Sequence, residues 1–205
     1  MLLGRERERR VLEGLLSSAR SGTSAVLVVA GEPGIGKSAL LDEAAATADG
    51  FTVLRARGVE SESKVPFGGL LELLRPAVGR LGSIPGPQSE ALGRALALQP
   101  GQTGDRFAVG AATLSLLAAE ADERPVLVLI DDVPWLDDPS AAALLFAIRR
   151  LVADPIAVIV SARTGEASLF DGAGLDSLEL GGLGCTAPSR RARPSRSPRR
   201  ASPTG

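Results

Sequence analysis

The sequence predicts an α/β fold, in which a parallel β-sheet is flanked by helices on both faces. Short apolar runs alternate along the chain with longer segments of helical character, and this alternation is typical of parallel sheets. The two clearest runs, 25–30 and 126–130, contain only alanine, valine, leucine and isoleucine, as expected of strands buried on both faces. A long stretch of helical character, 59–123, separates the second predicted strand from the third.

Four elements are predicted before this insert. Residues 6–19 place valine and leucine side chains at the spacing of one helical face. The apolar strand 25–30 comes next and leads into a glycine-rich loop. Residues 38–48 then predict a second helix, and 51–56 predict the second strand.

The insert is predicted to be helical. Residues 66–78 and 89–98 form two candidate helices, separated by the glycine- and proline-rich segment 82–87. Residues 105–121 give a stronger helical pattern. The apolar side chains expected on one side of that third helix are Phe107, Leu114, Leu117 and Ala118.

The remaining elements complete the sheet. After the strand 126–130, Asp137 and Asp138 are interpreted as helix-start residues, because Pro139 suits the first turn of a helix. That helix is expected to run to about residue 152. Residues 156–160 predict a fourth strand, and 178–180 predict a short fifth strand.

The composition excludes several function classes. The chain has 205 residues, of which 44% are hydrophobic, enough for the buried core of one domain. Aromatic residues make up 3%, with no Tyr, so a surface that stacks nucleic-acid bases is not expected. One Cys and no His exclude an internal disulfide and a His/Cys zinc site. No apolar run approaches the roughly 18 residues of a membrane span, and no signal-peptide pattern opens the chain, so a cytoplasmic protein without membrane contact is expected.

The charge is distributed unevenly, and this asymmetry suggests a domain boundary. Residues 185–205 contain six Arg, no acidic residue and no Val, Leu, Ile or Phe. Such a segment cannot form a core and is expected to be disordered. Residues 1–184 hold 17 basic and 24 acidic side chains. They are expected to form a single domain, and their negative balance argues against DNA contact.

A motif of the form G-x-x-x-x-G-K-[ST] follows the first predicted strand. Its residues, all expected to contact a nucleotide, are Gly31, Glu32, Pro33, Gly34, Ile35, Gly36, Lys37 and Ser38. The glycines let backbone N–H groups point at phosphate oxygens, and the next helix offers its positive N-terminal end. Lys37 would contact the β- and γ-phosphates, and the Ser38 hydroxyl would ligate Mg²⁺. The motif predicts binding of ATP or ADP with Mg²⁺; the alternative is a glycine-rich turn that binds nothing.

Two carboxylates, Asp131 and Asp132, follow the apolar strand 126–130. Ligands bind at this carboxyl edge in open α/β sheets. We expect Asp131 to hold Mg²⁺ through water, opposite Ser38, and Asp132 to polarise the attacking water. Arg163 follows the fourth predicted strand and would face the γ-phosphate as a second catalytic residue, provided that this strand lies between the first and third. The alternatives are an ordinary acidic turn and a solvated arginine.

Four stretches of the chain carry a more specific signal. They are 3–8 (LGRERE), 31–38 (GEPGIGKS), 66–76 (PFGGLLELLRP) and 129–137 (LIDDVPWLD). Together they resemble the signal-transduction ATPases with numerous domains, the STAND branch of the AAA-like P-loop ATPases. More narrowly, they resemble the N-terminal ATPase region of large ATP-binding LuxR-type transcriptional regulators, over residues 2 to about 184.

The resemblance implies a P-loop NTPase fold with strand order 5-1-4-3-2. It also implies that Gly4, Arg5 and Glu6 meet the adenine and ribose side of the nucleotide, and that Arg163 is the sensor arginine after strand four. Relatives often carry a polar residue where this chain has Pro134. This difference is expected to affect nucleotide hydrolysis more than nucleotide binding.

Relatives continue past the fifth strand into a helical lid, a winged-helix segment, sensor repeats and a helix-turn-helix DNA-binding domain. The abrupt composition of residues 185–205 suggests instead a fragment, or a GC-rich gene translated out of frame. The expected function is Mg-ATP binding and slow ATP hydrolysis, as the nucleotide switch of a truncated LuxR-type regulator. The alternative is an autonomous small P-loop protein whose basic tail binds nucleic acid or a partner.

Overall fold

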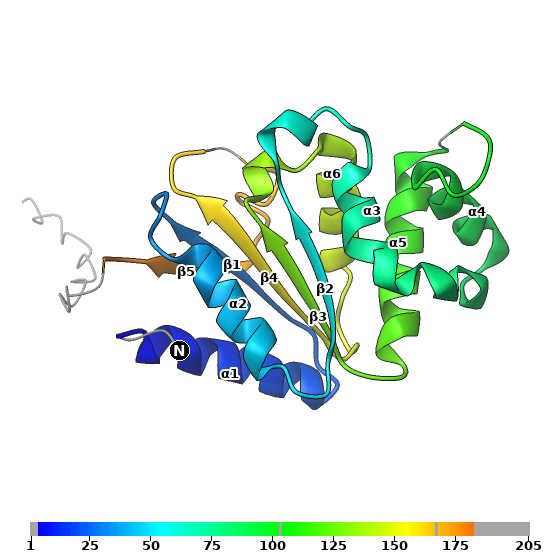
Figure 1. Ribbon diagram of the computed structural model, residues 1–205. Coiled ribbons are helices and arrows are strands. Elements are labelled where there is room, and N and C mark those ends of the chain that lie inside the picture. The colour runs from blue at the N-terminus through cyan, green and yellow to red at the C-terminus, as the bar shows by residue number, and fades with distance from the viewer. Residues whose placement is uncertain (1–3, 103, 167, 183–205) are drawn as a thin grey trace, which may run out of the picture.

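The computed structural model describes residues 4–182 except Thr103 and Ala167. A five-stranded parallel sheet forms its centre, with strand order β2-β3-β4-β1-β5 (Figure 1). Its strands are β1 (Ala25–Gly31), β2 (Thr52–Arg57), β3 (Val126–Asp131), β4 (Ile156–Arg163) and β5 (Asp176–Leu180). Read from the other edge, the order is 5-1-4-3-2, so the predicted fold class and strand order are both confirmed.

Helices cover both faces of this sheet (Figure 1). The α-helices are α1 (Glu6–Arg20), α2 (Lys37–Thr47), α3 (Gly68–Leu74), α4 (Gly86–Ala95), α5 (Arg106–Ala121) and α6 (Asp138–Ile148). Three 3₁₀ segments, Glu60–Glu62, Arg75–Ser83 and Val133–Trp135, join them. The helical insert between the second and third strands is confirmed, because α3, α4 and α5 all lie between β2 and β3 in the chain.

Alternation along the central strands divides the core into two layers. In β3, Leu127 and Leu129 pack with α1 and α2, whereas Val126, Val128 and Ile130 pack with α3, α5 and α6. All five side chains are buried. This two-sided burial explains why the strand reads as a continuous apolar run.

The structure corrects the predicted helices of the insert. The segment 66–78 is not one α-helix, because α3 ends at Leu74 and a 3₁₀ helix follows to Ser83. Pro76 is the physical reason: it has no N–H to donate, so the α-helical hydrogen bonds of α3 end with that from the Arg75 N–H to the Leu71 carbonyl oxygen. The second predicted helix, 89–98, is shifted, since α4 spans Gly86–Ala95.

The predicted face of α5 is only partly correct. Leu117 is buried as predicted, Leu114 and Ala118 are half-buried, and Phe107 is 62% exposed. The helix also buries Val109, Ala112 and Leu116, which were not predicted on this face. The neighbouring helices explain the rotation, because α5 packs against both α4 and α6. Phe107 instead meets Phe146 of α6 edge-on at a ring-centroid distance of 5.1 Å.

The start of α6 is as predicted, and its end is earlier. Asp137 caps the helix by accepting a hydrogen bond from the Ser140 N–H at 3.0 Å. The helix ends at Ile148 rather than near residue 152. After it, the N–H groups of Arg150 and Leu151 bond to the carbonyl oxygens three residues back, Ala147 at 2.9 Å and Ile148 at 3.3 Å, so the α-helical pattern gives way to a tighter final turn. In the part of the chain that the structure describes, none of the helices could span a lipid bilayer.

Candidate nucleotide-binding site

The glycine-rich motif connects the end of β1 to the start of α2, at the carboxyl edge of the sheet. Gly36 has a φ of 103°, in the left-handed region that favours glycine, and it caps α2 without a side-chain acceptor. Among the described residues, no acceptor bonds the N–H groups of Gly36, Lys37 or Ser38. These donors and the positive end of α2 together form an anion-binding loop.

Lys37 lies across this loop. Its side chain is buried, with the residue 6% exposed. The Nζ atom donates to the carbonyl oxygens of Gly31 at 2.9 Å and Glu32 at 3.0 Å. The ammonium is therefore held by its own loop, directly beside the free N–H groups. Ser38 is exposed in the first turn of α2.

Strand alternation brings four further polar side chains to the α2 side of the sheet, where each strand ends. In β3, Leu127 and Leu129 pack with α1 and α2, and Ala157 and Ile159 of β4 do the same. Every second residue after them therefore faces that side. The same alternation in β2 places its last residue on that side. The four side chains belong to Arg57, Asp131, Ser161 and Arg163.

Ser161 links the two carboxylate residues. Its side chain is fully buried in β4. The hydroxyl donates to Oδ1 of Asp131 and accepts the Asp132 N–H at 2.9 Å. It therefore fixes the end of β3 against β4. Ser161 was not predicted as a site residue, although it is a polar residue within an otherwise apolar strand.

Asp132 and Arg163 form an ion pair across β3 and β4. The Arg163 Nε lies 3.2 Å from Oδ1 of Asp132. This hydrogen bond and the charge of the carboxylate raise the pKa of Arg163 above its ordinary value. Arg163 also lies 3.5 Å from Glu166 and has its guanidinium 5.9 Å from the ring centroid of Trp135. Two residues predicted to be catalytic are thus in contact with each other.

The backbone around Asp132 is tightly constrained. Asp132 adopts a φ of 52°, which is uncommon outside glycine. A Cβ placed on Gly58 would lie 2.1 Å from the Asp132 carbonyl oxygen. Only glycine allows the chain after β2 to approach the loop after β3 this closely. The close approach holds the backbone of the loop that carries Asp132.

These groups surround a cavity of about 360 Å³, here called the phosphate hollow. Its lining residues are Pro33, Gly34, Gly36, Lys37, Ser38, Arg57, Asp132 and Arg163. The structure thus brings together the predicted loop, Asp132 and Arg163. Asp131 does not line the hollow, because its carboxylate lies against Ser161. Arg57 also lines the hollow and was not predicted to do so.

The N-terminal residues approach the loop from outside the hollow. Arg5 is 6% exposed and donates from Nη2 to the Ile35 carbonyl oxygen at 2.9 Å. It also pairs with Glu8 at 3.4 Å. Gly4 and Glu6 are exposed at the start of α1. Arg5 therefore supports the phosphate loop, while contact of these three residues with adenine and ribose stays a prediction.

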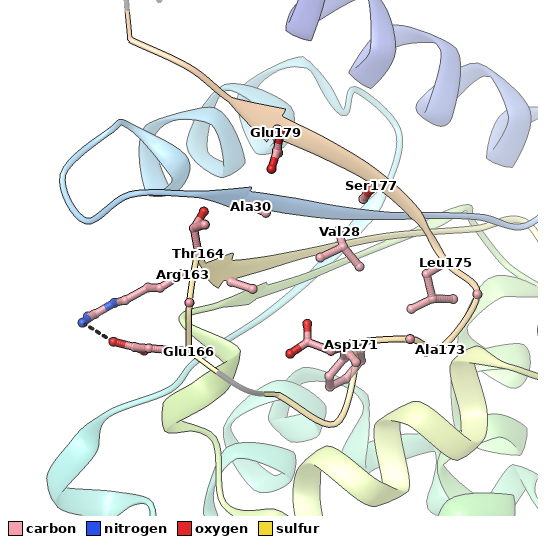
Figure 2. A pocket seen from close by; sticks show the side chains of 15 residues that line it. Val28, Ala30, Arg163, Thr164, Glu166, Asp171, Ala173, Leu175, Ser177 and Glu179 are labelled. Atoms are coloured by element: carbon pink, nitrogen blue, oxygen red, sulfur yellow. Dashed lines mark hydrogen bonds and ion pairs between the residues drawn. The ribbon is translucent and has the colours of Figure 1, made fainter. Parts of the chain in front are cut away.

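A larger cavity of about 690 Å³ lies on the other face of the sheet (Figure 2). Its floor includes Val28 and Ala30 of β1, which alternate with the residues that face α1 and α2. Glu166 and Glu179 lie at its edges (Figure 2). No residue of the motif 31–38 lines it. The phosphate hollow is therefore the candidate nucleotide site.

A glycine loop between a buried strand and a helix, at the same sheet edge as a strand that ends in carboxylates, defines a P-loop nucleotide-binding domain. The family model for the AAA ATPase domain matches residues 1–160. The chain belongs to this family. No curated protein sequence matches the chain.

Solved structures resemble the chain at low sequence identity. Drosophila ORC bound to DNA matches with 14% identity and a TM-score of 0.46, covering 86% of this chain and 42% of that chain. A Signal Transduction ATPase with Numerous Domains (STAND) protein with a tetratricopeptide repeat sensor, from Pyrococcus horikoshii, matches with 20% identity and a TM-score of 0.47 over 87% and 23%. C. elegans PCH-2 matches with 18% identity and a TM-score of 0.44 over 88% and 43%. The chain spans less than half of each of these three proteins.

Proposed function

We propose that this chain binds Mg-ATP in the phosphate hollow and hydrolyses it slowly. The observation that carries the proposal is the pairing of a buried Lys37 ammonium with free N–H groups at the start of α2. A positive charge and several aligned donors in one loop suit a polyphosphate better than a neutral or cationic ligand.

The residues present also fit a magnesium ion. Ser38 offers a hydroxyl oxygen beside Lys37, and Asp131 offers a carboxylate at the end of β3, on the same edge of the sheet. Hard oxygen ligands of this kind, used one or two at a time beside substrate phosphates, are what Mg²⁺ prefers. When bound, the ion would neutralise charge that develops on the phosphate oxygens. Because the Asp131 carboxylate lies against Ser161 and does not line the hollow, it would contact the ion through a water molecule.

Hydrolysis would depend on Asp132 and Arg163. We propose that Asp132 orients and polarises the attacking water and that Arg163 contacts the terminal phosphate. In this structure the two side chains are paired at 3.2 Å. Each would have to exchange its partner for water or phosphate before turnover, which is one physical reason to expect a slow reaction.

The proposal is tested by calorimetric titration of the full chain with ATP, with Mg²⁺ and with excess chelator, followed by measurement of phosphate release. We expect binding that weakens on removal of Mg²⁺ and a slow release of phosphate. Absence of binding under both conditions would overturn the proposal.

Replacing the two carboxylates separately distinguishes their proposed roles. Asp131→Asn is expected to weaken Mg²⁺-dependent ATP binding and turnover together. Asp132→Asn is expected to change ATP affinity less than about twofold and to reduce the turnover rate at least about tenfold, because a water-polarising group acts mainly in the transition state. Unchanged hydrolysis by Asp132→Asn would contradict its catalytic role.

For the whole protein, we propose the nucleotide switch of a LuxR-type regulator of the STAND branch. Support comes from the motifs at 3–8, 66–76 and 129–137, in addition to the phosphate loop. Regulation by nucleotide would require the lid, sensor and DNA-binding domains that such regulators carry. The alternative, an autonomous P-loop protein with a nucleic-acid-binding tail, rests on the six Arg of residues 185–205. This tail lies outside the described residues.

Deletion of the tail separates these two proposals. We propose that residues 1–184 form the complete domain, so a chain ending at Gly184 should keep its thermal midpoint and its ATP affinity. The tail contains no large apolar side chain that could offset an ordering cost of about 1–2 kcal/mol per residue. Salt-dependent DNA binding that disappears on this deletion would favour the autonomous protein instead.

A further inference from the structure

Three cationic side chains line the phosphate hollow, and two of them form hydrogen bonds or ion pairs with other residues. Lys37 donates to two loop carbonyls, and Arg163 is paired with Asp132 and Glu166. Arg57, the last residue of β2, differs from both. Its side chain has no hydrogen bond or ion pair with any residue that the structure describes, and it is exposed to solvent at the edge of the hollow. The Glu72 carboxylate accepts the backbone N–H of Arg57 at 3.2 Å but forms no ion pair with its guanidinium.

The direction of Arg57 follows from its strand. Leu54 and Ala56 are buried in the core on the far side of the sheet, so Arg55 and Arg57 face α2. The side chain of Arg55 confirms this direction, because it forms an ion pair with Asp42 of α2. Arg57 lies one step further along the same face, toward the carboxyl edge.

The geometry of helix and strand places Arg57 level with the phosphate loop. Asp42 lies five residues after Lys37, or about 7.5 Å along α2. Arg57 lies two residues after Arg55, or about 6.6 Å along β2. Because α2 runs back from the carboxyl edge, these two steps bring Arg57 to the height of Lys37.

The residues that line the hollow indicate which phosphate Arg57 can reach. The loop residues Pro33, Gly34 and Gly36 form one side, where their backbone would surround the inner phosphates. Arg57, Asp132 and Arg163 come from the strand ends β2, β3 and β4. A terminal phosphate, extending from the loop toward these strand ends, would meet a guanidinium that forms no ion pair with a carboxylate of the described residues.

We propose that Arg57 binds the terminal phosphate of the nucleotide and gives the site its preference for a nucleoside triphosphate over a diphosphate. A guanidinium is planar and can donate two parallel hydrogen bonds to phosphate oxygens. The diphosphate lacks the group that reaches β2, so it gains nothing from Arg57. This inference rests on the proposed nucleotide-binding function and adds to it a specificity-determining residue.

The test compares Arg57→Ala and Arg57→Lys with wild type, by calorimetric titration of the full chain with Mg-ATP and with Mg-ADP. For Arg57→Ala, we expect ATP affinity to fall roughly tenfold and ADP affinity to change less than about twofold. Arg57→Lys should restore part of the ATP affinity, since it keeps the charge and loses the planar fork. The matched control is Arg55→Ala, on the same strand face but outside the hollow, which should leave both affinities unchanged.

Two results would overturn the inference. Unchanged ATP affinity in Arg57→Ala would show that the guanidinium does not contact the nucleotide. Equal losses of affinity for ATP and ADP would show that the guanidinium does not discriminate the terminal phosphate. If wild type binds ATP in either case, the proposed function stands without Arg57. If wild type binds neither nucleotide, the proposed function fails and the inference falls with it.

Discussion

Replacing Lys37 with alanine is expected to weaken ATP binding at least about tenfold, or about 1.4 kcal/mol. The Nζ atom provides a buried positive charge beside the loop N–H groups, and it also donates to the carbonyl oxygens of Gly31 and Glu32. The substitution removes both the charge that faces the phosphates and the contacts that shape the loop. Calorimetric titration of both proteins with Mg-ATP measures the difference.

The chain provides its own control for this experiment. Lys64 is its second lysine, it is exposed, and it does not line the phosphate hollow. Lys64→Ala changes the net charge by the same amount and should leave ATP affinity as in wild type. Equal affinities for wild type and Lys37→Ala would contradict the account, provided that the variant keeps its thermal midpoint.

Replacing Asp137 with alanine is expected to lower the free energy of unfolding by about 3 kcal/mol. Asp137 is 3% exposed, and its carboxylate accepts three backbone N–H groups. The donors are Phe67 at 2.8 Å, Gly69 at 3.1 Å and Ser140 at 3.0 Å. These bonds join the start of α3 to the start of α6, so the substitution leaves donors of both helices without an acceptor.

Urea unfolding of the two proteins measures this loss. Asp138→Ala is the matched control, because Asp138 is the next residue, is exposed and lies in the first turn of α6. Its loss should cost about 0.5 kcal/mol through the helix dipole alone. Similar destabilisation by the two substitutions would show that the buried hydrogen bonds of Asp137 contribute little.

The strands could be predicted because their signal is local. Residues 25–30 and 126–130 are apolar throughout since both faces of each strand are covered. The exposure of Phe107 could not be predicted in this way. Periodicity indicates that a helix has an apolar side, but the neighbours that bury it come from elsewhere in the chain, here α4 and α6. The strand order came from the family resemblance rather than from the pattern.

The site residues likewise fall into those predicted from local sequence and those that depend on how distant segments pack. Lys37 and Ser38 belong to a contiguous motif, and the structure places both in the phosphate hollow. Ser161 and Arg57 were missed because their roles arise only when β4 lies beside β3 and β2 ends at the same edge. The pairing of Asp132 with Arg163 has the same origin. Each residue was predicted to act on the nucleotide, and neither prediction anticipated that they would contact each other.

A nucleoside triphosphate is expected to bind along the loop 31–38. A crystal structure of the chain grown with Mg²⁺ and a slowly hydrolysed ATP analogue tests it most directly. We expect the inner phosphates on the N–H groups of Gly36 and Lys37, with the terminal phosphate extending toward Asp132 and Arg163. A nucleotide bound instead in the cavity of Figure 2, on the other face of the sheet, would contradict it.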